Sequence, residues 1–226
     1  MNPTPITITD FLSFFPQTIF QTFYDPDSRG KPAPAFLEYN ESEFKKLNKE
    51  SNGIYFSVNG FDGRRIKEKL AILNSVFGDL DTSKNEDETP EKEREGRKRS
   101  LWKALVNELC PPNLIIVTKN GLQPIWLLKD ALVTEAETAV EVCDGIRVWS
   151  TSRGALGDKV KDVCRVLRLP GYYHCKSPEN PYLIRAFLLH EDRISLLTLK
   201  QEYPFVSEEK QYQENKEVYK ELPSLA

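Results

Sequence analysis

Two carboxylates one residue apart, Asp79 and Asp81, are the first residues whose types and spacing suggest chemistry. They end a segment, residues 73–80, that is typical of a buried strand. Side chains alternate along a strand, so both carboxylates are expected on one face. Two like charges side by side are costly unless a cation lies between them. The pattern predicts a site for a hard divalent cation such as Mg²⁺. The alternative is a solvated strand end, since Asp-X-Asp is a short and common pattern.

A second candidate is the turn over residues 118–123, with the sequence Thr-Lys-Asn-Gly-Leu-Gln. Asn-Gly is a strong signal for a tight turn between two strands. The glycine permits close backbone approach, and the lysine and glutamine offer hydrogen-bond donors, so the turn suits a phosphate or nucleotide. The candidate nucleotide-binding residues here are Thr118, Lys119, Asn120, Gly121 and Gln123. An ordinary hairpin with an exposed lysine is the alternative.

The segment from Gly145 to His190 is basic within a chain whose net charge is −3. It holds eight Lys or Arg residues against three Asp or Glu residues. A polyphosphate or a nucleic-acid strand would find its counter-charge here. The core of the segment, and the rest of the candidate nucleotide-binding set, is Arg165, Arg168, His174 and Lys176.

Two further acids, Asp158 and Asp162, are candidates for a third metal ligand. A short helix is expected over residues 158–165, which would place both carboxylates on one face. Asp158 would then cap the helix by accepting backbone N–H bonds. Asp162 has no such local demand and lies closer in sequence to Arg165 and Arg168, so Asp162 is the predicted ligand. The alternatives are ordinary helix-end charge for Asp158 and a surface pair with Arg165 for Asp162.

The elements that hold these residues follow from hydrophobic patterns and turn signals. Strands are expected over residues 53–58, 73–80, 113–117, 124–128, 167–171 and 182–189. Helices are expected over residues 41–49, from Pro90 to about Cys110, and from Thr134 to about Trp149. Asn40 or Ser42 and Thr134 are the expected caps. The charged run over residues 84–99 is expected to be a solvated loop that leads into a helix.

Length and composition limit the domain organisation and the cellular location. A chain of 226 residues, 39% of them hydrophobic, forms one large domain or two small lobes. We expect a catalytic domain over residues 1–205 and a linker or terminal helix over 206–226, leading to any further domain. The sequence has no long apolar span and no signal peptide, so a cytoplasmic location is expected. The four cysteines are widely spaced, which favours free thiols over a structural zinc site.

Together these residues resemble the archaeo-eukaryotic primase superfamily. The similarity is greatest to its RepB-like primase, or primase-polymerase (PrimPol), branch, which is found in plasmids, phages and other mobile elements. Three blocks carry the resemblance, in matching order and spacing over roughly residues 50–190. They are Phe77-Gly78-Asp79-Leu80-Asp81, residues 111–126, and a third block that runs from Gly157-Asp158 through Asp162 to Arg165-Val166-Leu167-Arg168-Leu169-Pro170-Gly171-Tyr172-Tyr173-His174.

The resemblance implies a two-lobed α/β (α+β) catalytic core with an RRM-like sheet. It implies a template-directed nucleotidyltransferase, a DNA primase or DNA polymerase, that adds nucleotides and starts strands de novo during replication. Two divalent ions, Mg²⁺ or Mn²⁺, would be bound by Asp79, Asp81 and Asp162 as catalytic residues. The implied partners are a single-stranded DNA template or primer–template, a dNTP or NTP, and a helicase domain or protein, with no membrane. One departure is Gln123, which stands where many relatives have a histidine that contacts the nucleotide.

Two other functions remain open. A non-catalytic replication initiator on the same fold would use the basic residues to bind nucleic acid without the metals. A metal-dependent nuclease also uses clustered acids and is the less favoured enzyme alternative.

Overall fold

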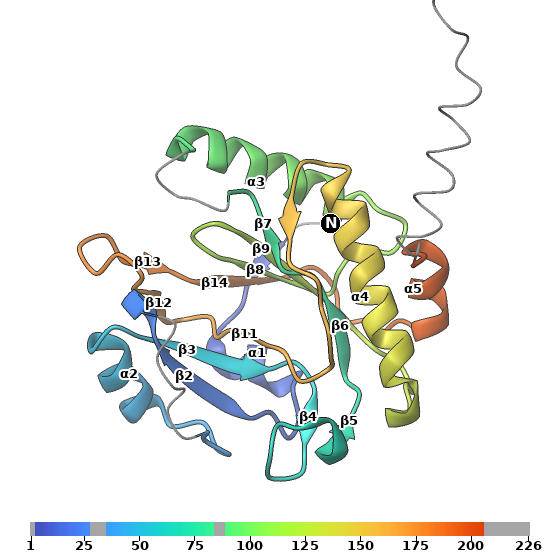
Figure 1. Cartoon of the computed structure of the whole chain (residues 1–226), viewed down its shortest axis with the longest axis horizontal. Coiled ribbons are helices and arrows are strands. Elements are labelled where there is room, and N and C mark those ends of the chain that lie inside the picture. The colour runs from blue at the N-terminus through green and yellow to red at the C-terminus, as the bar shows by residue number, and fades with distance from the viewer. Residues whose placement is uncertain (1–2, 28–34, 84–88, 206–226) are drawn as a thin grey trace, which may run out of the picture.

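The computed structural model describes residues 3–27, 35–83 and 89–205, which form two antiparallel sheets with helices packed beside them (Figure 1). The large sheet has the strand order β1-β14-β8-β9-β7-β10, and β6 also pairs with β9. Its strands are β1 (Thr4–Pro5), β6 (Ser75–Phe77), β7 (Leu80–Asp81), β8 (Leu114–Val117), β9 (Gly121–Leu127), β10 (Leu156–Gly157) and β14 (Arg185–Leu188).

The small sheet has the strand order β11-β3-β2. The remaining strands of the described residues form two separate two-stranded hairpins. The members of the small sheet are β2 (Phe20–Tyr24), β3 (Asn52–Ser57) and β11 (Val166–Arg168). The hairpins pair β4 (Gly60–Phe61) with β5 (Leu70–Ile72), and β12 (Tyr173–His174) with β13 (Tyr182–Leu183).

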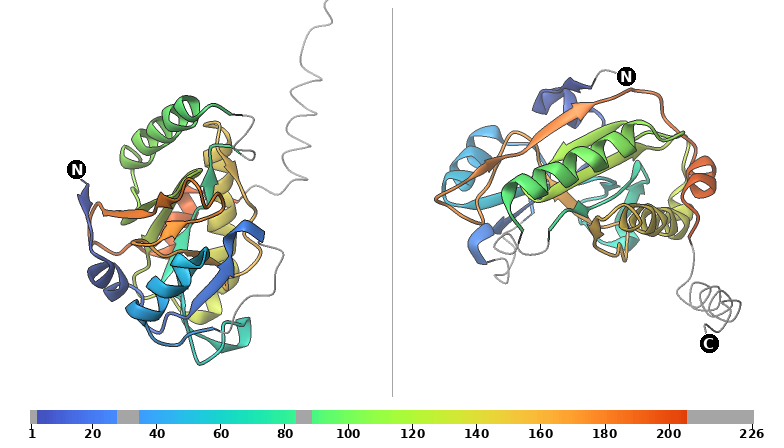
Figure 2. Two further views of the ribbon diagram at one scale, coloured as in Figure 1. Left: turned by 90° about the vertical axis from the view of Figure 1, so that its left-hand side faces the viewer. Right: turned by 90° about the horizontal axis from the view of Figure 1, so that it is seen from above.

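Five α-helices occur among the described residues: α1 (Ile8–Ser13), α2 (Glu41–Lys49), α3 (Glu91–Val106), α4 (Ala136–Thr151) and α5 (Leu196–Glu202). Short 3₁₀ turns are η1 (Asp25–Asp27), η2 (Lys67–Lys69) and η3 (Val133–Glu135). Helix α2 packs on β3, α3 on β9 and α4 on β6. Seen from the side, α3 and the large sheet form one half of the molecule, and α1, α2 and the small sheet form the other (Figure 2, left). This arrangement agrees with the expected two-lobed α/β fold.

One hydrophobic core runs through both sheets. Phe11 and Phe56 pack in the half that contains the small sheet, with ring centroids 5.1 Å apart, and Val76, Ile125 and Trp126 are fully buried in the large sheet. Every residue of β9 is buried. A strand covered on both faces reads as a continuous apolar run, and β8 was recognisable in the sequence for that reason, whereas β9 was predicted from residue 124 by the Asn-Gly turn and begins earlier, at Gly121.

The hairpin of β8 and β9 and the helix α2 confirm the sequence predictions. The Asn-Gly turn sets the β8–β9 register, with Val117 opposite Leu122. The Asn40 side chain accepts a hydrogen bond from the backbone N–H of Glu43 at 3.0 Å, so Asn40 is the cap of α2. Both features depend on contacts within a few residues, which local patterns predict well.

The prediction of a helix over residues 158–165 is wrong. These residues run in an extended and turn conformation from β10 to β11, and Val160 and Val163 are buried there. β-Branched residues and aspartate are weak helix formers, and both ends of the segment are fixed by strand pairing. Asp158 is therefore not a helix cap, so a capping role of Asp158 gives no reason to prefer Asp162 as the metal ligand.

Three element boundaries also differ from the predictions. The strand expected over residues 73–80 is split into β6 and β7, with a break at Gly78 and Asp79. Helix α3 ends at Val106 rather than near Cys110. At this end the side-chain amide of Asn107 donates a hydrogen bond to the carbonyl of Lys103 at 2.7 Å. Thr134 does not cap a helix, because the Glu135 carboxylate accepts the backbone N–H of Leu132 and begins the helical segment earlier.

Two predictions fall partly or wholly outside the described residues: the solvated loop over residues 84–99, of which 84–88 are not described, and the linker or helix over 206–226. All four cysteines are free thiols, as expected. Within the described ranges no helix has the length and apolar character needed to cross a membrane.

Candidate active site

A cavity of about 1230 Å³ lies between residues of the two sheets. Phe23, Tyr55 and Arg168 line it from the small sheet, and Asp81 and Gln123 line it from the large sheet. Ten of the twelve candidate site residues line this one cavity: Asp79, Asp81, Thr118, Asn120, Gln123, Asp162, Arg165, Arg168, His174 and Lys176. The fold therefore brings together three sequence blocks that were identified separately.

The two acids of the Asp-X-Asp pattern both face the cavity. Asp81 lies in β7, between β9 and β10 in the sheet, and burial together with the negative charges of Asp79 and Asp158 raises its pKa to about 7. Asp79 precedes β7, and its Oδ1 accepts a hydrogen bond from Gln123 Nε2 at 3.0 Å. Burial is the larger cause of the raised pKa and repulsion from the neighbouring carboxylates the smaller one, and a bound cation would relieve both by stabilising the ionised form.

Asp158 lies beside the Asp79–Asp81 pair because β10 pairs with β7. Leu156 is opposite Asp81 in this register, so the chain leaves β10 next to the acid motif. Arg165 joins the acids: its Nη2 is 3.6 Å from Asp79 Oδ2 and 3.4 Å from Asp158 Oδ2. The Arg165 guanidinium therefore supplies positive charge between two carboxylates.

Asp162 also lines the cavity but has a local hydrogen bond. Its Oδ1 accepts the backbone N–H of Cys164 at 2.8 Å, which closes a tight turn within the segment that leads to β11. The local use that the sequence suggested for Asp158 thus belongs to Asp162, and the structure ties Asp158 rather than Asp162 to Asp79 through Arg165.

The basic side of the cavity is organised by an acid that sequence reasoning missed. Asp25, at the start of η1, accepts hydrogen bonds from both terminal nitrogens of Arg168 at 3.0 Å. It also accepts the backbone N–H of Cys175 at 2.8 Å. The positive charges of Arg168 and Lys176 offset a small part of the rise in the pKa of Asp81, which places both cations near the acid motif. No local pattern marks Asp25, because its partners lie 143 and 150 residues away.

The turn over residues 118–120 is held from behind by a buried lysine. Lys98 of α3 is 3% exposed, and its Nζ donates to the carbonyls of Thr118 at 3.2 Å and Lys119 at 3.1 Å. It also pairs with Glu95. Lys98 belongs to the charged run predicted to be solvated, so its burial was missed. One signal was available: Lys98 lies three residues from Leu101, on the helix side that carries the buried leucines.

Two of the candidate nucleotide-binding residues do not line the cavity. The Lys119 ammonium lies 3.4 Å from Ser177 Oγ, at a smaller neighbouring pocket of about 230 Å³. A Cβ added to Gly121 would lie 2.1 Å from the carbonyl oxygen of Leu80. The sequence suggested that Gly121 allows a phosphate to approach the backbone. In the structure, the missing side chain instead makes room for the backbone of β7.

The donors in the cavity are suited to divalent ions that borrow ligands from a substrate. Among the described residues no three Asp, Glu, His or Cys side chains are close enough to form a complete metal site. Asp79 and Asp81 nevertheless offer clustered carboxylate oxygens, and the pKa of Asp81 is raised first by burial and then by the negative charges of Asp79 and Asp158. Mg²⁺ is commonly bound by one or two carboxylates with water and substrate phosphates completing its shell. The residues present fit such an ion.

No protein-family model matches the sequence, and no curated protein matches it. Solved structures, however, are similar to it in fold. The archaeo-eukaryotic primase (AEP) domain of the cyanophage S-2L primase-polymerase is 15% identical with a TM-score of 0.63, over 87% of this chain and 96% of that one. The catalytic domain of the primase RepB′, in complex with initiator DNA, is 14% identical with a TM-score of 0.51, over 95% and 97%. A second structure of RepB′ is 17% identical with a TM-score of 0.50, over 96% and 67%. The chain thus has the fold of the archaeo-eukaryotic primase catalytic domain.

Proposed function

We propose that this protein is a template-directed nucleotidyltransferase, a DNA primase or primase-polymerase that binds a dNTP or NTP and a DNA strand in the cavity. The observation that carries the proposal is the juxtaposition of Asp79 and Asp81 with Arg165, Arg168 and Lys176 around one cavity. Clustered acids facing clustered bases suit a substrate that brings both a metal and a polyphosphate. The similarity to primase structures supports the same class.

The side chains would divide the work by charge. Arg165, Arg168, His174 and Lys176 would attract and orient the triphosphate and stabilise negative charge as pyrophosphate leaves. Asp79 and Asp81 would hold two divalent ions, Mg²⁺ or Mn²⁺, which when bound help to activate the attacking 3′-hydroxyl and to neutralise the leaving group. Gln123 would fix the orientation of Asp79 through its 3.0 Å hydrogen bond.

We assign the third acid to Asp158 rather than Asp162. Asp158 shares Arg165 with Asp79 and contributes to the raised pKa of Asp81, whereas Asp162 accepts a backbone hydrogen bond in its own turn. Asp158 would then hold a divalent ion together with Asp79 and Asp81, and Arg165, which contacts both Asp79 and Asp158, would supply positive charge at the edge of this acid group.

The test is incubation of the chain with a DNA template, with and without a primer, nucleoside triphosphates, and Mg²⁺ or Mn²⁺. We expect longer products from the wild-type protein. Asp79→Asn and Asp81→Asn should each lower the incorporation rate by about a thousandfold or more, because they remove the charge that holds the metals. The matched control is Asp62→Asn, since Asp62 is an exposed acid 3.6 Å from Lys69 and does not line the cavity.

The same assay separates the other functions. Shortened strands that require Asp79 would indicate a nuclease. Unchanged strands with a metal-independent mobility shift would indicate a non-catalytic initiator. Near wild-type extension by Asp79→Asn and Asp81→Asn would refute the assignment of the metals to these acids.

A further inference from the structure

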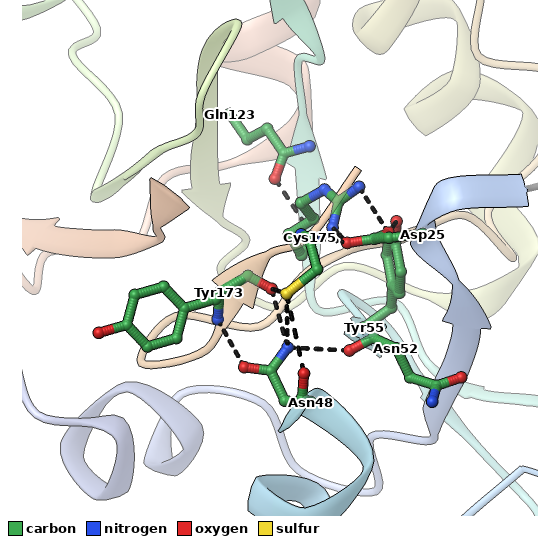
Figure 3. A network of polar contacts seen from close by, with 8 residues as sticks. Asp25, Asn48, Asn52, Tyr55, Gln123, Tyr173 and Cys175 are labelled. Carbon is green, nitrogen blue, oxygen red and sulfur yellow. Dashed lines mark hydrogen bonds and ion pairs between the residues drawn. The ribbon is translucent and has the colours of Figure 1, made fainter. Parts of the chain in front are cut away.

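Asp25 lines the basic side of the cavity and is the centre of a buried polar cluster (Figure 3). Its carboxylate is 5% exposed and has four donors around it. Arg168 Nη1 and Nη2 and the Cys175 backbone N–H lie within 3.0 Å, and the Tyr55 hydroxyl lies at 3.4 Å. The carboxylate is therefore fully used in holding other groups, and it joins η1 to β3, β11 and the segment after β12.

Three contacts hold Arg168 in place: two to its guanidinium and one to its backbone N–H. The guanidinium is paired with Asp25 on one side and lies over the Tyr55 ring, 4.8 Å from its centroid. The backbone N–H of Arg168 donates to Gln123 Oε1 at 3.4 Å, and Gln123 in turn donates to Asp79. A continuous chain of contacts thus runs from Asp25 to the acid motif.

The neighbouring sequence leaves room for this pair. A Cβ added to Gly53, on β3, would lie 2.5 Å from Asp25 Oδ1 and 2.9 Å from Arg168 Nη1. Any larger residue at position 53 would displace one of them. Burying a carboxylate and a guanidinium carries a desolvation cost that their attraction often does no more than offset. Gain in stability is therefore a weak reason for the pair, and a fixed orientation of Arg168 is a better one.

We propose that Asp25 is a positioning residue for the phosphate-binding side of the cavity. It holds the Arg168 guanidinium directly, and it holds His174 and Lys176 through the backbone of Cys175 between them. This inference rests on the proposed function, because it assigns those three side chains to the triphosphate. Asp25 itself touches no reacting atom.

The test compares Asp25→Asn with the wild-type chain and with Asp62→Asn, the same chemical change on the surface. On a primer–template with a saturating metal, we expect Asp25→Asn to lower kcat about tenfold or more, because the α-phosphate is no longer held in line. The KM for the nucleotide and the Kd of inorganic tripolyphosphate should stay within about threefold, since the removed negative charge offsets the lost orientation.

A second variant and a second readout keep the test independent of folding and of activity. Gly53→Ala retains every charge but pushes on Asp25 and Arg168, so it should reproduce the fall in kcat. Nitrogen-15 spectra should show separate Nη–H signals for Arg168 in the wild type, because the paired guanidinium cannot rotate freely, and an averaged signal in Asp25→Asn. Arg168→Lys identifies the signal.

The possible outcomes distinguish a positioning role of Asp25 from other roles. Separate Arg168 signals that persist in Asp25→Asn would overturn the inference, even if the wild type incorporates no nucleotide and the proposed function fails. A lower KM with unchanged kcat would make Asp25 a competing counter-ion. Equal losses in melting temperature, kcat and affinity would make it a purely structural residue. The combination of a specific fall in kcat and loss of the fixed Arg168 signal supports positioning.

Discussion

Gly121→Ala tests how the acid motif is held in place. A Cβ at position 121 would lie 2.1 Å from the Leu80 carbonyl oxygen and 2.8 Å from Asp81 Cα. Ordinary contact needs about 3.5 Å, so β7 would have to retreat by about 1 Å. Overpacking of about 1–3 kcal/mol and the loss of two ladder hydrogen bonds of about 1 kcal/mol each give a destabilisation of about 3–5 kcal/mol.

Thermal or urea unfolding measures this effect directly. For a chain of this size we expect a fall in melting temperature of about 6–20 °C. Nucleotide incorporation should fall about a hundredfold as Asp81 is displaced. Gly96→Ala is the matched control: Gly96 lies inside α3 with open space around its Cα, so alanine should stabilise the protein by about 0.5–1 kcal/mol. Wild-type stability with weakened nucleotide binding in Gly121→Ala would refute the packing explanation and return this glycine to the ligand.

Three further predictions concern the same site. In EDTA, Asp81→Asn should be more stable than the wild type by up to about 4 kcal/mol above pH 7. The difference should shrink as pH falls from 7 to 4, because the raised pKa makes the ionised form of Asp81 costly in the folded state; identical pH profiles of melting temperature would contradict this. Asp158→Asn should lose most incorporation at an unchanged melting temperature, and Asp162→Ala, which removes the acceptor of the Cys164 N–H, should keep incorporation while losing about 1 kcal/mol of stability; the reverse pattern would return the third acid to Asp162. Lys98→Met should cost about 2 kcal/mol in urea unfolding, because two carbonyls of the 118–120 turn lose their donor, and unaltered stability would show that the turn holds itself.

Local sequence patterns predict the features that depend on neighbouring residues. The Asp-X-Asp spacing, the Asn-Gly hairpin and the Asn40 cap each involve contacts across two to four positions. Their geometry is nearly fixed once the residue types are known. The basic block around Arg168 was also visible, because charge content needs no three-dimensional information. These features indicated most of the residues around the cavity, and the resemblance of the three sequence blocks to primases implied the fold class.

Tertiary structure decided the partners of those residues. Residues 158–165 have a spacing that a helix could use, yet pairing of β10 with β7 and of β11 with β3 holds them extended and places Asp158 at the acid motif. Asp25 meets Arg168 across 143 residues of sequence, and Lys98 meets the turn across about 20. Local propensities differ by only about 1 kcal/mol per residue, so strand pairing and core burial override them. Which acid faces which base is therefore set by the packing of the two sheets, and no local pattern records it.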